Sequence, residues 1–230
     1  MDFSFCIITD GSPAAQDRIL DTIESIQNLQ IENYEILCIG GMHEFDISKI
    51  DWDMIKNFKR FYFDESVKPG WITKKKNEIA RLAKYENLVL FHDYYIFDRE
   101  WYNGYNRIND QTGGLWHVSS NPVVMINGQR DYTDWVTYDH PKFGIHWTID
   151  YNNWNLTEYQ YISGGYFVVK KEFFLENLFD ENMIAGQEED VEWSKRVRTR
   201  GTIICNPYSV VRQTKKHRNL GIIPKMVPNE

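Results

Sequence analysis

Short apolar runs alternate with amphipathic segments along the first half of the chain. Runs at 3–9, 34–39, 58–63 and 88–91 predict four buried strands, because each is short, apolar and bounded by glycine, proline or polar residues. The segments between them have helical periodicity and carry helix-start signals, which are Ser12 with Pro13 and, further on, Thr73. Strands alternating with helices indicate an α/β fold with a mostly parallel central sheet.

The residues that follow these strands are the first candidates for a ligand site. In open parallel sheets, ligands bind beyond the carboxyl ends of the strands. The residues at these ends are polar or glycine, and they are Thr9, Asp10, Gly11, Gly40, Gly41, Asp64, His92 and Asp93.

The pattern changes at 109–158, where the chain is polar and rich in aromatic residues. Asn127 and Gly128 separate two short runs and predict a hairpin turn. We interpret the whole segment as hairpins and long loops over the edge of the sheet.

The last part of the chain returns to regular structure. A strand is expected at 159–169, interrupted by Gly164 and Gly165. A helix is expected to begin at Glu188–Asp190 and to run to 200, where Gly201 would end it in the left-handed conformation. A final strand is expected at 202–206, followed by a basic tail that ends as coil.

Composition places the chain among globular proteins with one domain, 1–230. Its 230 residues are 42% hydrophobic and 26% charged, which is enough apolar material for a core. A net charge of −7 argues against nucleic acid as a partner. The chain contains no apolar run of about 18 residues and no basic segment before its first strand, so neither a membrane span nor a signal peptide is expected. With three cysteines inside apolar runs, we expect a cytoplasmic protein.

Three kinds of cluster have residue types that could carry chemistry. His92 and Asp93 end an apolar strand, where a carboxylate beside an imidazole can hold a divalent cation. Glu188, Glu189 and Asp190 fall in the first turn of a helix, whose dipole favours an ionised carboxylate that can act as a base. Two basic clusters, at 74–76 and 215–218, could neutralise a diphosphate. Each cluster alone is also explained as a polar strand end, an acidic helix start or a solvated surface.

Taken together and in order, these segments resemble GT-A fold glycosyltransferases, in particular family 2 and the β-1,4-galactosyltransferase group. FSFCIITDG resembles the first strand of the nucleotide-binding half, KKKN the element that starts a helix near the nucleotide, and LFHDYYIF the region of the DxD motif. The most specific match is 163–201, where a Gly-Gly strand is followed by a Gly-x-Glu-Asp motif, then by Arg196 and Gly201. RQTKKHRN resembles the galactosyltransferase tail that supplies a metal-binding histidine.

The resemblance implies an inverting, metal-dependent transferase that moves a hexose from a UDP-sugar to a hydroxyl group of an acceptor, for which a glycan is expected. UDP-galactose or UDP-glucose is the first expectation for the donor. Asp190 would be the catalytic base, and Glu189 beside it would help to position the acceptor. Mn²⁺ or Mg²⁺ would bind to Asp93 and His217. The residues expected to contact the nucleotide-sugar are Thr9, Asp10, Gly11, Asp64, Lys76, Asp93, Gly164 and Gly165.

The same resemblance divides the chain into a nucleotide-binding half, 1–108, and an acceptor-binding and catalytic half, 109–230. Trp147, Trp154 and Glu188 are the candidates for contacts with the acceptor. Two departures from the family pattern stand out, because Tyr94 or Tyr95 replaces the last Asp of DxD and glycines replace the Asp after the second strand. The alternatives are a non-catalytic protein that binds carbohydrate or nucleotide-sugar on the same fold, and a nucleotidyltransferase.

Overall fold

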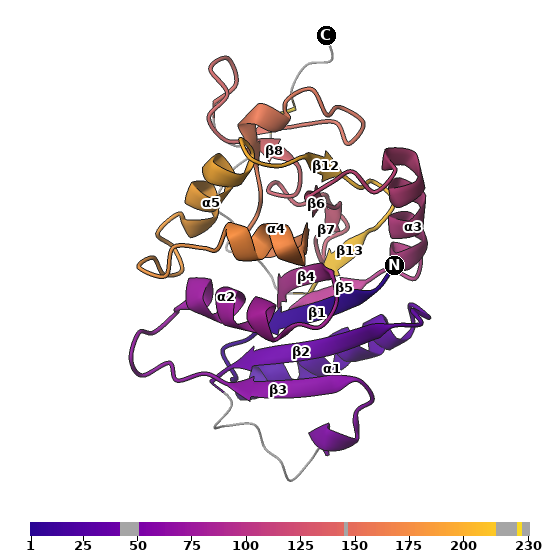
Figure 1. The fold of residues 1–230 in the computed structure, drawn as a ribbon, viewed down its shortest axis with the longest axis vertical. Coiled ribbons are helices and arrows are strands. Elements are labelled where there is room, and N and C mark those ends of the chain that lie inside the picture. Colours follow the sequence, from indigo (N-terminus) through magenta and orange to yellow (C-terminus); the bar gives the residue numbers. More distant parts are fainter. Residues whose placement is uncertain (42–50, 145–146, 215–224, 227–230) are drawn as a thin grey trace.

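The computed structural model describes residues 1–41, 51–144, 147–214 and 225–226. Its centre is a seven-stranded sheet (Figure 1), with the strand order β12-β6-β11-β4-β1-β2-β3. The strands in this order are β12 (Ile203–Cys205), β6 (Val118–Ser120), β11 (Tyr166–Lys170), β4 (Asn87–His92), β1 (Phe3–Ile8), β2 (Tyr34–Gly40) and β3 (Phe58–Tyr62).

The first four strands of the chain are parallel, as their apolar runs predict. β1 pairs with both β2 and β4, and Ile8 lies opposite Ile39 and His92. The residues that follow these three, including Thr9 and Asp93, therefore come together at one edge of the sheet. β11 is antiparallel to β4 and β6, whereas β6 and β12 are parallel to each other. The sheet is therefore mostly parallel, as expected.

Helices cover both faces of this sheet because the side chains of each strand alternate between two apolar layers. In β1, Phe3, Phe5 and Ile7 face one layer, while Cys6 and Ile8 face the other. The first layer is completed by α1 (Pro13–Gln27) and α3 (Trp101–Thr112), and the second by α2 (Ile72–Leu82), α4 (Lys171–Glu176) and α5 (Glu189–Val197). The result is a three-layer arrangement of helices, sheet and helices.

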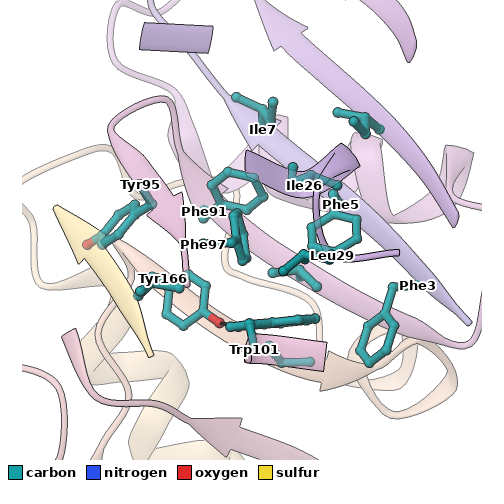
Figure 2. Packing of buried hydrophobic residues seen from close by; sticks show 14 of the residues in the cluster. Phe3, Phe5, Ile7, Ile26, Leu29, Phe91, Tyr95, Phe97, Trp101 and Tyr166 are labelled. Carbon is teal, nitrogen blue, oxygen red and sulfur yellow. Dashed lines mark hydrogen bonds between the residues drawn. The ribbon is translucent and has the colours of Figure 1, made fainter. Parts of the chain in front are cut away.

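Aromatic rings fill much of the first layer (Figure 2). Trp101 packs edge-on against Phe3 and Phe97, and its indole Nε1 donates a hydrogen bond to the Tyr166 hydroxyl at 2.8 Å. Five of the eight tryptophans are almost fully buried, namely Trp52, Trp101, Trp116, Trp135 and Trp193. The high aromatic content of the chain therefore serves mainly the core.

Two small sheets extend the domain beyond the central one. The four-stranded sheet has the order β10 (Gln160–Tyr161), β8 (Val136–Thr137), β9 (Trp147–Thr148) and β14 (Lys225–Met226). The three-stranded sheet has the order β5 (Tyr95–Phe97), β13 (Val211–Gln213) and β7 (Val123–Val124). Short 3-10 helices lie at Trp52–Met54 and Thr157–Tyr159. None of the described helices combines the length and the apolar character needed to cross a bilayer.

Several local expectations need correction. The strand expected at 159–169 is two strands, β10 and β11, which belong to different sheets. The segment 109–158 contains regular structure besides loops. It includes the last residues of α3 and the strand β6, which inserts into the central sheet. The hairpin turn at Asn127 and Gly128 is confirmed, since the Gly128 amide donates to the Met125 carbonyl oxygen at 2.8 Å and Val124 bridges Arg130.

The ends of two helices also differ from expectation. α5 ends at Val197, and Gly201 does not have a positive φ. Gly201 is required for space instead, because a Cβ there would lie 2.5 Å from the Phe173 ring. α2 begins at Ile72 after Trp71, and the Thr73 hydroxyl donates to the Met183 carbonyl oxygen rather than capping the helix. Part of the expected coil at the C-terminus forms β13 and β14.

Candidate active site

Asp93 lies at the carboxyl end of β4 with both carboxylate oxygens in use. The Thr9 hydroxyl, at the end of β1, donates to its Oδ2 at 2.6 Å. The Arg18 guanidinium, from the second turn of α1, donates to its Oδ1 at 3.1 and 3.2 Å. Asp93 is only 4% exposed, and burial raises its pKa, while the hydrogen bonds and charge of Thr9 and Arg18 act in the opposite direction. Sequence analysis selected Thr9 and Asp93, but missed Arg18.

These contacts do not fit a metal ion. A cation at Asp93 would have to displace Arg18, whose positive charge also repels it. Tyr95, at the position of a DxD carboxylate, is 3% exposed and packs with Phe97 and Tyr166 in the core. Among the described residues, no three His, Cys, Asp or Glu side chains come together as a metal site would require.

The second expected metal ligand, His217, lies outside the described residues. The tail that leads to it does approach the site, because β13 runs antiparallel to β5. The amide of Thr214 donates to the carbonyl oxygen of Tyr94 at 2.9 Å, directly after Asp93. The expectation that the tail belongs to the site is therefore compatible with the course of the chain up to 214, and it stays a prediction.

The ends of β1, β2 and β3 form a second polar group. Gly11 has φ +74°, and its amide donates to the Thr9 hydroxyl at 3.1 Å. The ammonium group of Lys75, from α2, donates to the Thr9 carbonyl oxygen at 3.0 Å and forms an ion pair with Glu65. Asp10 is exposed beside this group. Asp64 is also exposed, and its carboxylate accepts a bond from the Ser66 amide at 2.9 Å.

Gly164 and Gly165 connect the Asp93 region to α5. The Gly165 carbonyl oxygen accepts a hydrogen bond from the His92 amide at 3.1 Å, which holds the glycines against the end of β4. The Gly164 amide donates to Asp190 Oδ2 at 3.0 Å. A Cβ on Gly164 would lie 3.0 Å from the Asp190 Cβ, so the close approach of these two segments favours glycine.

Asp190 lies in the first turn of α5, as the sequence predicts. Its Oδ2 accepts hydrogen bonds from the Gly164 amide and the Tyr161 hydroxyl, and its Oδ1 accepts one from the Val191 amide at 3.0 Å. All three are neutral donors. A carboxylate in the first turn of a helix and beside neutral donors is chemically suited to accept a proton from a hydroxyl group.

An open hollow of about 290 Å³ lies directly at Asp190. Its lining residues are Tyr138, Tyr161, Gly186, Glu188, Glu189, Asp190 and Val191. Glu188 has φ +59°, which is uncommon for a residue with a side chain, and its Oε1 accepts a hydrogen bond from the Tyr138 hydroxyl at 3.2 Å. Sequence analysis selected all three carboxylates, but not the two tyrosines.

Glu189 and Lys76 lie deeper than Asp190. Glu189 is 6% exposed, and its pKa is raised by burial and by the charge of Asp190, while the charge of Lys76 lowers it. Lys76 is fully buried, and its ammonium donates to the Gly164 carbonyl oxygen at 2.7 Å. Its ammonium contacts the protein backbone and the core, and its expected contact with the nucleotide-sugar stays a prediction.

The two tryptophans proposed for the acceptor do not line this hollow. Trp147 is half-buried and packs against Phe143 with ring centroids 5.2 Å apart. Trp154 is 37% exposed, and its indole donates to the Tyr151 carbonyl oxygen at 3.2 Å. The aromatic side chains that lie beside Asp190 are the two tyrosines. A signal for Tyr161 existed, because it lies two residues before the motif-bearing segment 163–201.

Comparisons of the sequence found no relatives, since no protein-family profile and no curated protein matches it. Comparison of the structure did find similar folds. S. aureus TarS 1–349 in complex with UDP-GlcNAc is 13% identical with a TM-score of 0.66, over 94% of this chain and 60% of TarS 1–349. GalNAc-T7 with UDP, GalNAc and Mn²⁺ is 16% identical with a TM-score of 0.67, over 98% of this chain and 46% of GalNAc-T7.

Both neighbours are GT-A glycosyltransferases. This chain spans less than two thirds of the length of each neighbour. At 13% and 16% identity, the similarity shows the fold alone. The similarity to the β-1,4-galactosyltransferase group expected from 163–201 is not confirmed. The shared arrangement is the mixed α/β domain with a central, mostly parallel sheet flanked by helices, and the protein has the GT-A fold.

Proposed function

We propose that this protein is a glycosyltransferase that uses a UDP-sugar as donor and Asp190 as the catalytic base. The observation that carries the proposal is the environment of Asp190. Its carboxylate accepts hydrogen bonds from three neutral donors, and the residue lines an open hollow. The GT-A fold of the chain and the UDP-sugar and UDP in the neighbours' structures support the donor class. A hexose on UDP and a hydroxyl group of a glycan remain the substrates that we propose.

The reaction that we propose uses two parts of the site, which are the carboxyl ends of the strands and the hollow at Asp190. The donor would bind over Thr9, Asp10 and Gly11 at the carboxyl ends of the strands, where ligands of such sheets bind. The acceptor would enter the hollow, and its hydroxyl oxygen would attack the anomeric carbon from the side opposite to UDP. The new bond joins that oxygen to the anomeric carbon, the bond from this carbon to the diphosphate breaks, and UDP leaves. Asp190 takes the hydroxyl proton, and the configuration is inverted.

The divalent cation expected from the resemblance is not part of the mechanism that we propose. GalNAc-T7 was crystallised with Mn²⁺ and UDP, which is the support for it. The contacts of Asp93 with Thr9 and Arg18 do not fit a metal ion, as described above. We therefore assign no step of the reaction to a metal, and propose that Arg18 supplies positive charge where the diphosphate binds. The contacts favour Lys75 over Lys76 as the lysine near the diphosphate, because Lys75 bonds to Thr9 and Lys76 bonds to Gly164.

The acceptor site that we propose is the hollow itself. Tyr161 and Tyr138 give it aromatic surface, with their ring centroids 5.9 Å apart, and Glu188 gives it a hydrogen-bond acceptor. Sugars bind well to such a mixture of aromatic faces and carboxylates. Trp154 is exposed outside the hollow and remains a candidate for the more distant units of a longer acceptor.

The test is a panel of nucleotide sugars with and without glycan acceptors, with release of nucleoside diphosphate as the readout. We expect UDP release from a UDP-hexose that increases when an acceptor is present. Release of pyrophosphate from nucleoside triphosphates would identify a nucleotidyltransferase instead. Binding of UDP-sugars without any turnover, in every combination, would identify a non-catalytic binding protein, which the altered DxD motif makes the main alternative.

A further inference from the structure

Three consecutive lysines open α2, and each has a different environment. Lys74 is at the surface, where it pairs with Glu78 at 3.7 Å and lies over the Trp71 ring. Lys75 reaches the strand ends at Thr9, as described above. Lys76 turns into the protein toward Gly164. Because successive helix positions differ in direction by about 100°, three identical neighbours can serve three different purposes.

Lys76 is an unusual side chain to bury. It has no exposed surface, and its ammonium lies 4.8 Å from the centre of the Phe179 ring. A buried ammonium is strongly unfavourable unless it is hydrogen-bonded and near opposite charge. The hydrogen bond is the one to the Gly164 carbonyl oxygen, at 2.7 Å. An apolar residue would fill the same space at lower cost, so a lysine at this position indicates a role for its charge.

The Gly164 peptide connects Lys76 to Asp190. Its carbonyl oxygen accepts from the Lys76 ammonium, and its amide donates to Asp190 Oδ2. A Cβ placed on Gly164 would lie 3.1 Å from Lys76 Nζ and 3.1 Å from Asp190 Oδ2, so both side chains converge on one point. Any movement of the Gly164 backbone would therefore move the hydrogen bond that holds Asp190.

The charges agree with this geometry. Burial lowers the pKa of Lys76, and the negative charges of Glu189 and Asp190 oppose that effect. Lys76 in turn lowers the pKa of Glu189. The other titratable groups that face the carboxylate pair are Tyr161 from β10, Tyr138 beyond β8, and Glu188 before α5, while Lys75 acts on Lys76 from α2 itself. Among the described residues, Lys76 is therefore a cation whose charge interacts with both Glu189 and Asp190.

We propose that Lys76 is a positioning residue, which fixes the Gly164 peptide and thereby Asp190 and Glu189 in the geometry needed for proton transfer. This inference rests on the proposed function and gives Lys76 a role other than neutralising the donor phosphate. It separates the three lysines into a surface residue, a donor-side residue and an acceptor-side residue.

The three substitutions Lys74→Met, Lys75→Met and Lys76→Met form one experiment on the full chain. Methionine keeps most of the unbranched side chain and removes the ammonium group, with its charge and its hydrogen bonds. For Lys76→Met we expect kcat to fall by about 10- to 100-fold, the loss that a displacement of about 1 Å at a reacting group can cause, with unchanged affinity for UDP. Lys75→Met is expected to weaken UDP binding, and Lys74→Met to change neither quantity.

The pH profile adds a readout that simple loss of packing would not change. Without the positive charge of Lys76, the pKa of Glu189, which we propose helps to position the acceptor, rises. The acid limb of the kcat/KM profile for the acceptor should therefore move to higher pH in Lys76→Met and stay in place in Lys74→Met. A thermal melt of each variant shows that it is folded. The proposal is overturned if Lys76→Met lowers UDP affinity and leaves kcat unchanged, because Lys76 would then act on the donor.

A titration that needs no turnover separates this inference from the proposed function. In ¹³C-carboxyl NMR, the pKa of Glu189 should be higher in Lys76→Met than in the wild type, and unchanged in Lys74→Met. If the wild type transfers no sugar, the proposed function fails, but the titration still decides whether Lys76 controls the carboxylates. Identical titration curves in all three proteins would contradict the coupling that we propose.

Discussion

Two aspartates at the same edge of the sheet have opposite environments. Asp93 is 4% exposed, and its oxygens accept hydrogen bonds from the Arg18 cation and the Thr9 hydroxyl. Asp190 lines an open hollow and, among the described residues, accepts hydrogen bonds from neutral groups, which include the Gly164 amide. One carboxylate is enclosed and paired with a cation, and the other is accessible from solvent.

The difference shows how one residue type can serve binding in one place and chemistry in another. Asp93 is enclosed and paired with the Arg18 guanidinium, so the hydroxyl group of an acceptor cannot reach its carboxylate. Asp190 lines the hollow, so the hydroxyl group of an acceptor can reach its carboxylate and transfer a proton to it. We therefore assign donor binding to the Asp93 region and proton transfer to Asp190.

The largest effect is expected for Asp190→Asn, which keeps the size of the side chain but cannot accept the proton. Sugar transfer should fall by about 10² to 10⁴, the contribution of a general base, while UDP affinity and melting temperature stay close to wild type. Glu189→Gln is the matched control in the same helical turn, and a smaller loss is expected. Wild-type transfer by Asp190→Asn together with complete loss in Glu189→Gln would exchange the roles of the two acids.

A smaller effect is expected for Arg18→Met, measured as the affinity for UDP by calorimetry. Loss of one charge-assisted contact should weaken binding about tenfold, equivalent to about 1.4 kcal/mol. With Arg18 present we expect similar UDP affinities in Mn²⁺ and in EDTA, and in Arg18→Met we expect Mn²⁺ to restore part of the loss because Asp93 is then free.

Arg107→Met, at an exposed position where the guanidinium lies over the Tyr208 ring, is the control and should bind UDP normally. Marked tightening of UDP binding by Mn²⁺ in the wild type would show that a metal displaces Arg18, and would restore the cation expected from the resemblance.

The smallest expected effect is a difference between the wild type and Asp93→Asn in how the free energy of unfolding depends on pH. The pKa of Asp93 is raised in the folded protein above its ordinary value of 3.8, so ionisation is less favourable in the folded chain than in the unfolded one. As pH rises from 3.8 through the raised pKa, the wild type should lose stability relative to Asp93→Asn. Unfolding by urea at a series of pH values measures this difference.

Asp98→Asn removes a carboxylate from a more exposed ion pair, with Arg212 at 3.6 Å, and serves as the control. A wild type that gains stability relative to Asp93→Asn as pH rises through that range would show that the Arg18 pair outweighs the burial of Asp93. The carboxylate would then serve stability rather than donor binding.

The sequence was sufficient for the parts of the site that depend on local patterns. Apolar runs located the ends of β1 and β4, and therefore Thr9 and Asp93. The acidic first turn and the double glycine identified Asp190 and Gly164, although nothing in the pattern showed that the amide of one donates to the other.

Other parts depend on contacts that no local pattern contains. Arg18 meets Asp93 across 75 positions in the chain, and it lies in an ordinary helix. Three lysines in a row do not reveal which one faces inward, so the role expected for Lys76 differs from its contacts. Tryptophan content could not separate core from surface, and Trp135, in the segment expected to bind the acceptor, is fully buried.

The central claim is that this chain transfers sugar with Asp190 as the base, and the stoichiometry of one reaction tests it most directly. Wild type and Asp190→Asn are each incubated with a UDP-hexose and a glycan acceptor, and UDP and glycosylated product are followed together by ³¹P and ¹H NMR. We predict equal amounts of UDP and product with inverted configuration in the wild type, and about 10²-fold slower formation of both in the variant. Equal rates in the two proteins, or no product in the wild type with any UDP-hexose, would contradict the claim.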